Sequence, residues 1–318
     1  MSTILVSGAS GFVGSHMLPE LIAAGHRIAA FVRTRTAGEV VLGRLDPDER
    51  NAVEIRIGDV TSPETVTAAL GGVDGVLHLA AIPRDYRGGA DLRLINTEGT
   101  RNVVRAMEAA GVRRLVHMGA LGVVDDPALH YASSKARADQ LVEGSSLDWT
   151  IVKPSLQFGP RDGFFNIIAD LARMSPGLFP VPGAGASRFQ PIHAGDVARV
   201  VRASFEDPTT IGASFELGGP RYWTYREIVA EVLGVLRKRR VIVPVPVPLI
   251  ALVARTAEFA RLPFPVASDQ LRQLRLDNIG PLDLVPGRFG FTPRDMAGQL
   301  GYLQRRRRDQ EPRSLAAP

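Results

Sequence analysis

Cysteine is absent from the 318 residues of this chain. Its absence excludes disulfide scaffolds, thiolate metal sites and cysteine nucleophiles, and it fits an intracellular setting. A chain of this length buries a full hydrophobic core without disulfides. We therefore expect one large α/β domain with a smaller appended part.

Lysine is scarce as well. Only Lys135, Lys153 and Lys238 occur, so arginine carries almost all of the formal net charge of +5. The basic residues are scattered except for short runs at 237–240 and 305–308, and neither run has aromatic residues between its charges. Nucleic-acid binding requires basic groups gathered on one face with interleaved aromatics. We predict no nucleic-acid partner and interpret both runs as solvated charge.

Long apolar runs and targeting signals are also missing. No apolar run reaches the ~20 residues that span a bilayer, and no basic region precedes the first apolar strand. The six histidines lack a metal-binding spacing such as H-E-x-x-H, so we predict no metal site. The sequence predicts a cytoplasmic protein.

A glycine-rich turn follows the first apolar run, at residues 3–7. Its glycines have the spacing G-x-x-G-x-x-G at Gly8, Gly11 and Gly14. This pattern is typical of a strand, a tight turn and a helix whose free N–H groups face the phosphates of a nucleotide. In a chain with 32 glycines this spacing can also arise by chance. Its position at the start of a βαβ pattern favours a nucleotide site over a chance match.

Apolar strands alternate with helices through the first half of the chain. We predict further strands at 26–32, 53–57, 75–79 and 114–118, and helices at 63–70, 92–110 and 130–143. Such strands predict a parallel sheet covered on both faces. The predicted fold class is α/β, a Rossmann-type doubly wound parallel sheet.

The end of the second strand decides between the two nicotinamide cofactors. An acidic residue there would hold the ribose 2′-hydroxyl, whereas Arg33 and Arg35 pair with a 2′-phosphate. The sequence therefore favours NADP(H) over NAD(H), with a plain surface arginine as the alternative. At the end of the third strand, Asp59 places a short carboxylate where the exocyclic amine of adenine would sit.

Tyr131 and Lys135 are four residues apart in a predicted helix and share one face. The reference pKa of tyrosine is about 10, and a neighbouring ammonium group favours the phenolate. The pair is predicted to be an acid/base unit, with Lys135 also reaching ribose hydroxyls. A surface Tyr/Lys pair is the alternative.

These motifs, in this order, resemble the extended and atypical short-chain dehydrogenase/reductases. The resemblance rests on the glycine motif, residues 58–60 and 80–81, Asn96-x-x-Gly99-Thr100 and Tyr131-x-x-x-Lys135. Further segments look most like the branch that contains the NADPH-carrying accessory subunit of mitochondrial respiratory complex I and its free-standing bacterial relatives. Those segments are 148–160, 164–166, 188–198 and 215–220. The resemblance spans about residues 3 to 280.

The resemblance implies a role for each matching residue. The three glycines would contact the pyrophosphate, and Arg33 would bind the 2′-phosphate. Tyr131 would be the acid/base residue, with Lys135 as its partner. The implied cofactor-binding set is Gly8, Ser10, Gly11, Phe12, Val13, Gly14, Arg33, Arg35, Asp59, Val60, Ala80, Ala81, Met118, Tyr131, Lys135, Pro154 and Ser155. Within it, Asp59 and Val60 would contact adenine, Ala80 and Ala81 the ribose side, and Pro154 and Ser155 the nicotinamide.

One departure from the family pattern concerns the substrate. The family places a Ser or Thr at the end of the fifth strand to hold the substrate oxygen, but residues 117–122 contain no hydroxyl. A serine at Gly119 or Ala120 would restore it. Two functions stay open. One is an NADP(H)-dependent oxidoreductase acting on a small carbonyl, sugar-nucleotide or isoprenoid-like substrate; the other is a non-catalytic NADPH-binding accessory or sensing protein of a membrane-associated complex.

Beyond residue 160, the resemblance implies a small C-terminal α/β substrate lobe that caps the carboxyl ends of the strands. We place the NAD(P)-binding domain at 1–160, with its sheet completed by segments near 188–220, a discontinuous substrate lobe at 161–305 and a disordered tail at 306–318. His193, beside a strand end, is expected to be a packed or helix-capping side chain.

Two apolar stretches precede that tail. Residues 241–248 form a proline-spaced extended run, and 249–260 continue as an apolar helix that we expect to be buried. A protein partner or a membrane surface contacted through 248–260 is the alternative, which would make the protein peripheral to a membrane. The sequence also leaves an oligomer open.

Overall fold

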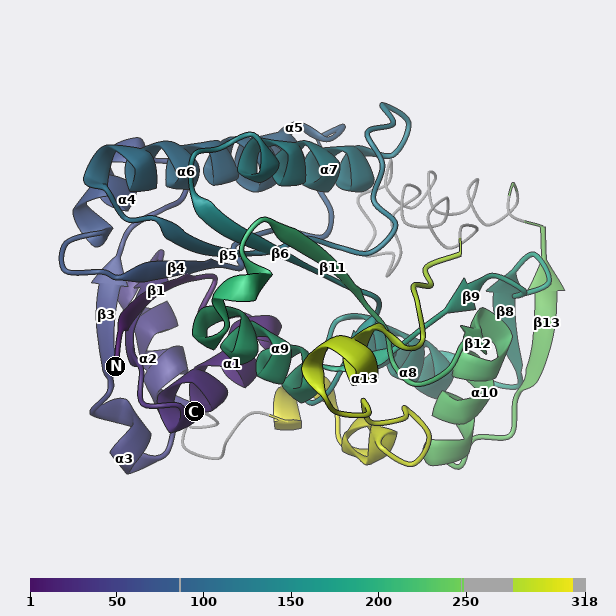
Figure 1. The fold of residues 1–318 in the computed structure, drawn as a ribbon. Coiled ribbons are helices and arrows are strands. Elements are labelled where there is room, and N and C mark those ends of the chain that lie inside the picture. The colour runs from purple at the N-terminus through teal and green to yellow at the C-terminus, as the bar shows by residue number, and fades with distance from the viewer. Residues whose placement is uncertain (86, 247, 249–276, 311–318) are drawn as a thin grey trace.

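A seven-stranded parallel sheet forms the centre of the computed structural model, which describes residues 1–85, 87–246, 248 and 277–310 (Figure 1). The strands are β1 (Thr3–Ser7), β2 (Arg27–Val32), β3 (Val53–Ile57), β4 (Gly75–His78), β5 (Arg114–Met118), β6 (Asp148–Pro154) and β11 (Ala213–Leu217). Their order is β11-β6-β5-β4-β1-β2-β3. The order reverses between β4 and β1, and at such a point open α/β sheets bind their ligands. The predicted fold class is confirmed.

Helices cover both faces of this sheet (Figure 1). On one face lie α1 (Phe12–Ala23), α2 (Arg35–Gly43) and α9 (Ala194–Glu206); on the other lie α4 (Pro63–Ala69), α6 (Gly99–Ala110) and α7 (His130–Glu143). Each layer has its own apolar core against the sheet. The inner strands β1, β4 and β5 therefore bury both faces and appear in the sequence as apolar runs, whereas the edge strands β3 and β11 alternate apolar and polar residues.

The helix predicted over 92–110 is a continuous helical stretch with a wider turn inside it. It consists of α5 (Ala90–Leu92), the π-helical segment η1 (Arg93–Glu98) and α6. The buried Asn96 lies in η1, and its side chain is hydrogen-bonded to the turn that follows β4. Short π-helical segments inside α-helices are frequently found at functional sites.

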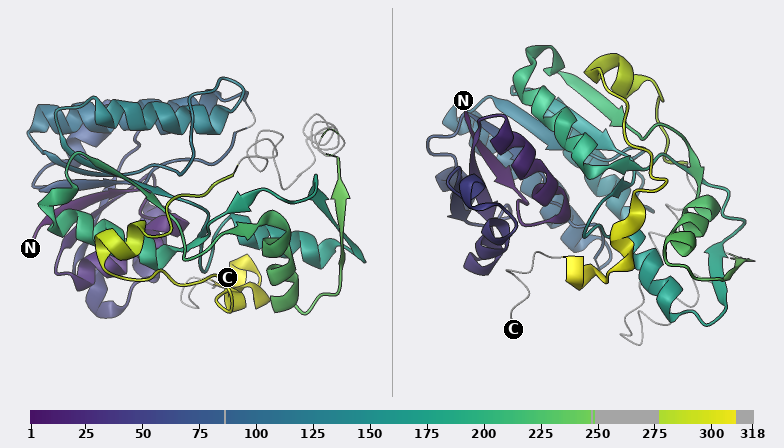
Figure 2. Two further views of the ribbon diagram at one scale, coloured as in Figure 1. Left: turned by 45° about the vertical axis from the view of Figure 1, so that its right-hand side comes forward. Right: turned by 90° about the horizontal axis from the view of Figure 1, so that it is seen from below.

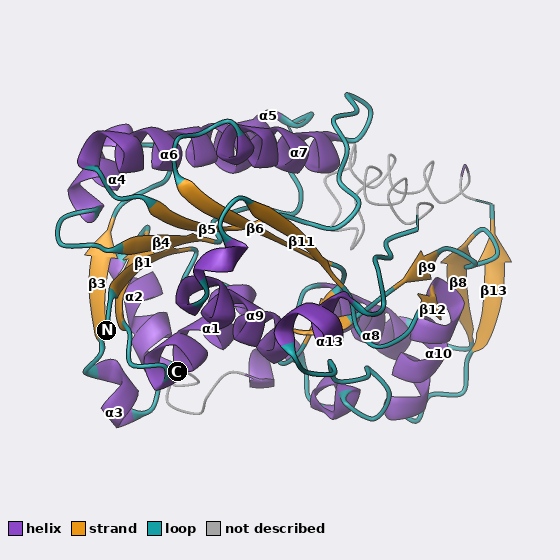
Figure 3. Ribbon diagram, viewed as in Figure 1, coloured by secondary structure: helices purple, strands orange, loops and turns teal. Residues whose placement is uncertain are grey.

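A second lobe with its own core packs beside the sheet (Figures 2 and 3). It contains α8 (Phe164–Met174), β8 (Leu178–Pro182), β9 (Arg188–Phe189), β12 (Trp223–Thr224), α10 (Tyr225–Val235) and β13 (Val241–Val245). The short pair β7 (Gln157–Phe158) and β10 (Ile192–His193) runs parallel. The remaining elements are α3 (Pro47–Arg50), η2 (Pro208–Thr210), α13 (Leu284–Phe289), η3 (Leu300–Gln304) and η4 (Arg307–Gln310).

The C-terminal predictions meet the structure only in part. The extended run at 241–248 contains β13, which pairs with β8, whereas the apolar helix at 249–260 lies outside the described residues. The tail was predicted to be disordered from residue 306. However, Arg307–Gln310 form η4, and the Gln310 amide donates a hydrogen bond to Asn166 Oδ1 at 2.8 Å. No described helix is long and apolar enough to cross a membrane.

Candidate functional site

The glycine-rich turn between β1 and α1 leaves no room for side chains at two of its positions. Gly8 has a φ of +73°, and a Cβ there would lie 2.9 Å from the backbone nitrogen of Ala80. A Cβ on Gly14 would lie 2.4 Å from the carbonyl oxygen of Ala9. The turn, the start of α1 and the residue pair after β4 therefore approach one another as backbone. This cradle fits a dinucleotide pyrophosphate at a helix N-terminus.

Basic side chains follow β2 and end α2, and one of them contacts the same turn. Arg33 and Arg35 are exposed after β2, and Thr34 between them caps α2 by accepting a hydrogen bond from the Ala37 N–H at 3.1 Å. Arg44, at the other end of α2, reaches back and donates from Nη1 to the Ser10 carbonyl at 2.6 Å. No sequence pattern marks Arg44, because its approach to the turn depends on the path of α2.

The loop after β3 holds Asp59 in a fixed orientation. Its Oδ1 accepts hydrogen bonds from the Thr61 N–H at 2.9 Å and from the Thr61 hydroxyl at 2.8 Å. The carbonyl of the neighbouring Val60 accepts one from Asn102 of α6 at 2.9 Å. The two residues predicted to meet adenine thus sit in a loop that is tied to the helix layer.

Tyr131 and Lys135 lie on the first two turns of α7, but the predicted effect of the lysine on the phenol is wrong. Lys135 is only 4 % exposed, and its Nζ donates to the Met118 carbonyl at the end of β5, at 2.5 Å. Burial, with a smaller contribution from Asp139, raises the pKa of Tyr131 to about 12. Burial lowers the pKa of Lys135 to about 8. The cost of desolvating a phenolate therefore sets the direction of the pKa shift of Tyr131, and Lys135 is not among its causes.

The side chain of Asn96 is fully engaged in hydrogen bonds within the fold. Its Oδ1 accepts from the Ile82 N–H at 2.8 Å, and its Nδ2 donates to the Ile82 carbonyl and to the Ser134 hydroxyl, both at 3.0 Å. With both amide atoms engaged, it does not replace the hydroxyl that is missing near Ala120.

A serine at Gly119, one of the two restorations considered above, does not fit. A Cβ there would lie 2.9 Å from Lys153 Cγ and 3.0 Å from Asp139 Oδ1. Ala120 already carries a Cβ and is partly exposed. A restored hydroxyl therefore belongs at position 120.

Residues after β6 join the two lobes. The Ser155 hydroxyl donates to Asn278 Oδ1 at 2.6 Å and accepts from the Gln190 N–H at 3.2 Å. Within the sheet domain, the carbonyl of Pro154 at the end of β6 accepts from the Leu121 N–H after β5 at 3.1 Å. His193 Nδ1 accepts from the Gly195 N–H at 3.0 Å and caps α9, so its predicted capping role is confirmed.

A second arginine that no sequence pattern marks links the second lobe to α1. Arg161 follows β7 with a φ of +74°, unusual for a residue with a side chain. Its Nη2 donates to the Ser15 hydroxyl, one residue after the last glycine of the motif, at 2.9 Å. Its backbone N–H donates to Gln310 Oε1 at 2.6 Å. Arg161 therefore fixes the start of α1 against the lobe and the C-terminal segment.

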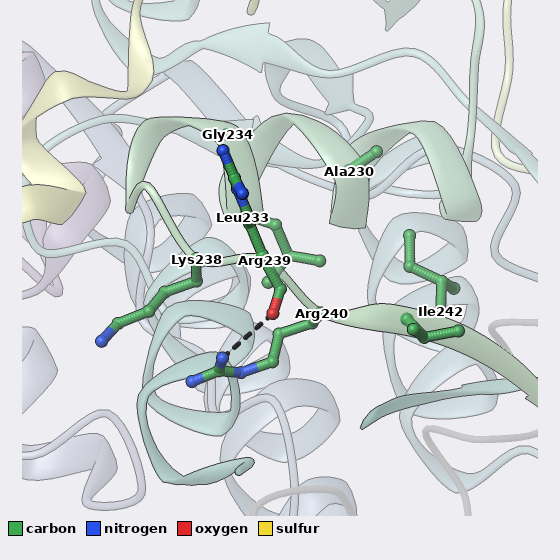
Figure 4. A pocket seen from close by; sticks show the side chains of 8 residues that line it. Ala230, Leu233, Gly234, Lys238, Arg239, Arg240 and Ile242 are labelled. Carbon is green, nitrogen blue, oxygen red and sulfur yellow. Dashed lines mark hydrogen bonds between the residues drawn. The ribbon is translucent and has the colours of Figure 1, made fainter. Parts of the chain in front are cut away.

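A surface hollow at the end of α10 contributes no residue to this site. It is lined by Lys238, Arg239 and Arg240 together with residues of α10 and β13 (Figure 4). Arg240 Nη1 donates to the Arg239 carbonyl at 3.1 Å. The basic run follows the end of α10, whose last turn holds no basic residue.

Comparison with known proteins identifies the family. The family model described as NAD(P)H-binding matches residues 8–172, just over half of the chain. The chain belongs to this NAD(P)H-binding family. Within the described residues, no group of three or more His, Cys, Asp or Glu side chains could hold a metal ion.

Relatives of this NAD(P)H-binding chain include a mitochondrial complex I subunit and a sugar epimerase. The mitochondrial "NADH dehydrogenase [ubiquinone] 1 alpha subcomplex subunit 9" of Arabidopsis thaliana is 26% identical, over 91% of this chain and 75% of the relative. An N-acetyl-alpha-D-glucosaminyl-diphospho-ditrans,octacis-undecaprenol 4-epimerase of Escherichia coli O157:H7 is 27% identical, over 77% of this chain and 76% of the relative. The resemblance to extended short-chain dehydrogenase/reductases and to the complex I subunit is therefore confirmed.

Solved structures share the fold. The UDP-glucose 4-epimerase of Thermus thermophilus, in complex with NAD, has a TM-score of 0.71 at 20% identity and covers 96% of this chain and 99% of its own. The NADPH-dependent quinone oxidoreductase of Escherichia coli, in complex with NADPH, has a TM-score of 0.73 at 17% identity, with coverages of 95% and 100%. At these identities the likeness concerns the fold alone.

Proposed function

We propose that this protein is an NADP(H)-dependent oxidoreductase that reduces a small carbonyl, sugar-nucleotide or isoprenoid-like substrate, with Tyr131 as the proton donor. The observation that carries the proposal is the fixed position of the Tyr131–Lys135 pair. Lys135 is bonded to Met118 at the carboxyl end of β5, and the glycine turn follows the carboxyl end of β1. In a parallel sheet these ends lie along one edge, so the pair and the cofactor cradle face the same side.

The residues of the cradle fit the cofactor. Gly8, Gly11 and Gly14 would hold the pyrophosphate, and Arg33 and Arg35, supported by Arg44, would hold the 2′-phosphate. Bound NADPH would supply the hydride. Because burial keeps Tyr131 protonated, its phenol is suited to donate a proton to the substrate oxygen. The absence of a hydroxyl at Ala120 should make this turnover slow.

Turnover by a Tyr131→Phe variant tests the proposed chemistry. We expect the variant to lose at least about 10²-fold in the rate of NADPH oxidation with a carbonyl substrate while binding NADPH normally. Tyr225→Phe is the matched control, because burial also raises the pKa of that phenol to about 12 and Tyr225 lies in the apolar core of the second lobe. An unchanged rate in Tyr131→Phe would place the chemistry elsewhere.

The preference for NADP(H) has a separate test. By calorimetry, NADPH should bind at least about tenfold tighter than NADH, which corresponds to ~1.4 kcal/mol and to one arginine–phosphate contact. Arg33→Ala should remove most of this preference, whereas Arg27→Ala, an exposed arginine at the start of β2, should keep it. Equal affinities in the wild type contradict the assignment.

A second candidate function is a non-catalytic NADPH-binding accessory protein of a membrane-associated complex. It is favoured by the missing hydroxyl at Ala120 and by the engagement of the Asn96 side chain in hydrogen bonds to Ile82. The complex I relatives that match most of the chain favour it as well. In this case NADPH would raise the melting temperature by mass action, yet no carbonyl would oxidise it, even with Ala120→Ser. A partner or membrane contact through residues 248–260 belongs to this alternative.

A further inference from the structure

A buried cluster of ionisable side chains lies directly behind the Tyr131–Lys135 pair, between α7, β5 and β6. We propose that Asp139 is a positioning residue for this pair: its carboxylate keeps Lys135 as an ammonium group and Tyr131 as a phenol, so that the pair is set to donate a proton. The proposal rests on the proposed function only in naming Tyr131 as the donor.

The helix places the three side chains on one side. Tyr131, Lys135 and Asp139 follow one another at intervals of four residues along α7, and side chains four apart in a helix are neighbours. Lys135 and Asp139 are 4 % and 3 % exposed. The carboxylate therefore lies one turn beyond the lysine, on the side away from the tyrosine, and is out of contact with water.

The strands supply two further neighbours of this carboxylate. Asp139 Oδ1 lies 3.3 Å from His117 Nε2 on β5, and Oδ2 lies 3.3 Å from Lys153 Nζ on β6. Within the described part of the chain, neither oxygen makes a hydrogen bond of normal geometry. A buried carboxylate is costly unless cations compensate it. Its charge is therefore left to act on the nearby ammonium groups.

The histidines of the cluster carry no charge at neutral pH. The His117 ring stacks on that of His78 with centroids 5.4 Å apart, and His78 is hydrogen-bonded on both sides, to Ser7 at 2.7 Å and to Thr100 at 3.0 Å. Burial lowers the pKa of both histidines, and the charge of Lys135 adds to this effect. The charges that face Asp139 are thus those of Lys135 and Lys153.

One more carboxylate lies at the rim. Glu143, the last residue of α7, has its Oε1 3.7 Å from Lys153 Nζ, but its side chain is 41% exposed. Water screens a charge in that position. Asp139 is consequently the buried anion that acts on the pair.

The carboxylate acts on both members in the same direction. Burial lowers the pKa of Lys135, and Asp139 opposes that change. Burial raises the pKa of Tyr131, and Asp139 adds to that change. Removing this one charge should therefore release protons from both groups at lower pH.

The test is an NMR titration of Asp139→Asn, a variant that keeps the shape of the side chain and removes its charge. The chain has only three lysines, so isotope-labelled lysine gives three signals that single substitutions assign. We expect the pKa of Lys135 to fall by about one unit or more. The pKa of Tyr131, assigned with Tyr131→Phe and labelled tyrosine, should fall as well.

Glu143→Gln is the matched control. It removes a carboxylate from the same helix, one turn further on, and should leave Lys135 and Tyr131 unchanged. Unchanged titration of both groups in folded Asp139→Asn overturns the proposal, because a purely structural Asp139 would alter the melting temperature and not these protonation states.

The wild type supplies a second measurement if Asp139→Asn does not fold. Lys135 should be an ammonium group at pH 7 in the cofactor-free protein, and a neutral Lys135 at that pH overturns the proposal. Neither titration needs turnover. A protein that shows the predicted shifts but oxidises NADPH with no carbonyl would keep Asp139 in this role and refute the proposed function alone.

Discussion

The glycine turn and the Tyr131–Lys135 pair lie along the same edge of the sheet, yet different physics forms them. The turn is a matter of backbone space: a Cβ at Gly14 would come within 2.4 Å of a carbonyl oxygen. The pair is a matter of burial and charge, because its protonation states depend on Asp139 and on the exclusion of water. Residue spacing predicts the first correctly, and it gave the wrong sign for the tyrosine pKa in the second.

The largest effect should come from closing the cradle. Gly14→Val places side-chain atoms against Ala9, so α1 cannot keep its position; we expect NADPH binding to fall below detection and stability to drop by about 3 kcal/mol or more. Gly25→Ala is the control: at a φ of +83° the alanine would strain the backbone, but nothing lies within 4 Å of its Cβ. Calorimetry and thermal melts measure both variants. Wild-type affinity in Gly14→Val would mean that the phosphates are held elsewhere.

The second largest effect should come from restoring the missing hydroxyl near the Tyr131–Lys135 pair. Ala120→Ser is expected to raise the rate of carbonyl reduction by about 10²-fold, the usual contribution of one preorganised donor. Gly119→Ser should not, because its Cβ would press on Lys153 and Asp139. Steady-state NADPH oxidation compares the two variants. An equal increase in rate in both variants would show that Lys153 and Asp139 can move aside to make room for a side chain at position 119.

A charge effect should also appear beside the cradle. Burial, aided by Arg161, lowers the pKa of His16 on α1 to about 4. Between pH 6.5 and 4 the unfolded chain binds a proton at this residue that the folded chain does not, so stability is full above pH 6.5 and falls as the pH drops. The loss should reach about 2–3 kcal/mol.

Denaturant unfolding from pH 7 to pH 4 measures this loss. His16→Gln should flatten the profile by the expected amount relative to the wild type. If the two profiles run parallel, His16 does not distinguish the folded from the unfolded state, and the cradle depends on backbone space alone.

The smallest effect concerns Arg44. Because it is bonded to the Ser10 carbonyl, Arg44→Ala should weaken NADPH binding by about 5-fold to 10-fold and NADH binding less. Arg50→Ala is the control, since Arg50 Nε donates to the Leu42 carbonyl at 2.8 Å, away from the turn. Calorimetry compares the affinities of both variants for NADPH and NADH. Equal losses for NADPH and NADH would contradict a contact with the 2′-phosphate.

Much of the fold was predictable because its signals are local. The strand ranges, the glycine turn and the helix that carries Tyr131 follow from apolar runs, glycine spacing and family pattern. The π-helical segment was not predictable. It contains Asn96, whose side chain is hydrogen-bonded to Ile82, and this bond depends on where the turn after β4 lies in the folded chain. The same holds for Arg44 and Arg161, whose contacts join segments 34 and 146 residues apart.

The sequence by itself determined the parallel α/β fold, the cofactor cradle and the positions of Tyr131 and Lys135, because each depends on neighbours along the chain. The tertiary structure alone decided that Lys135 is bonded to Met118, that Ser155 is engaged by Asn278, and that Asp139 lies beside His117 and Lys153. Hydrogen-bond partners and pKa shifts depend on distances and on the exclusion of water, and both are set only when distant segments pack together.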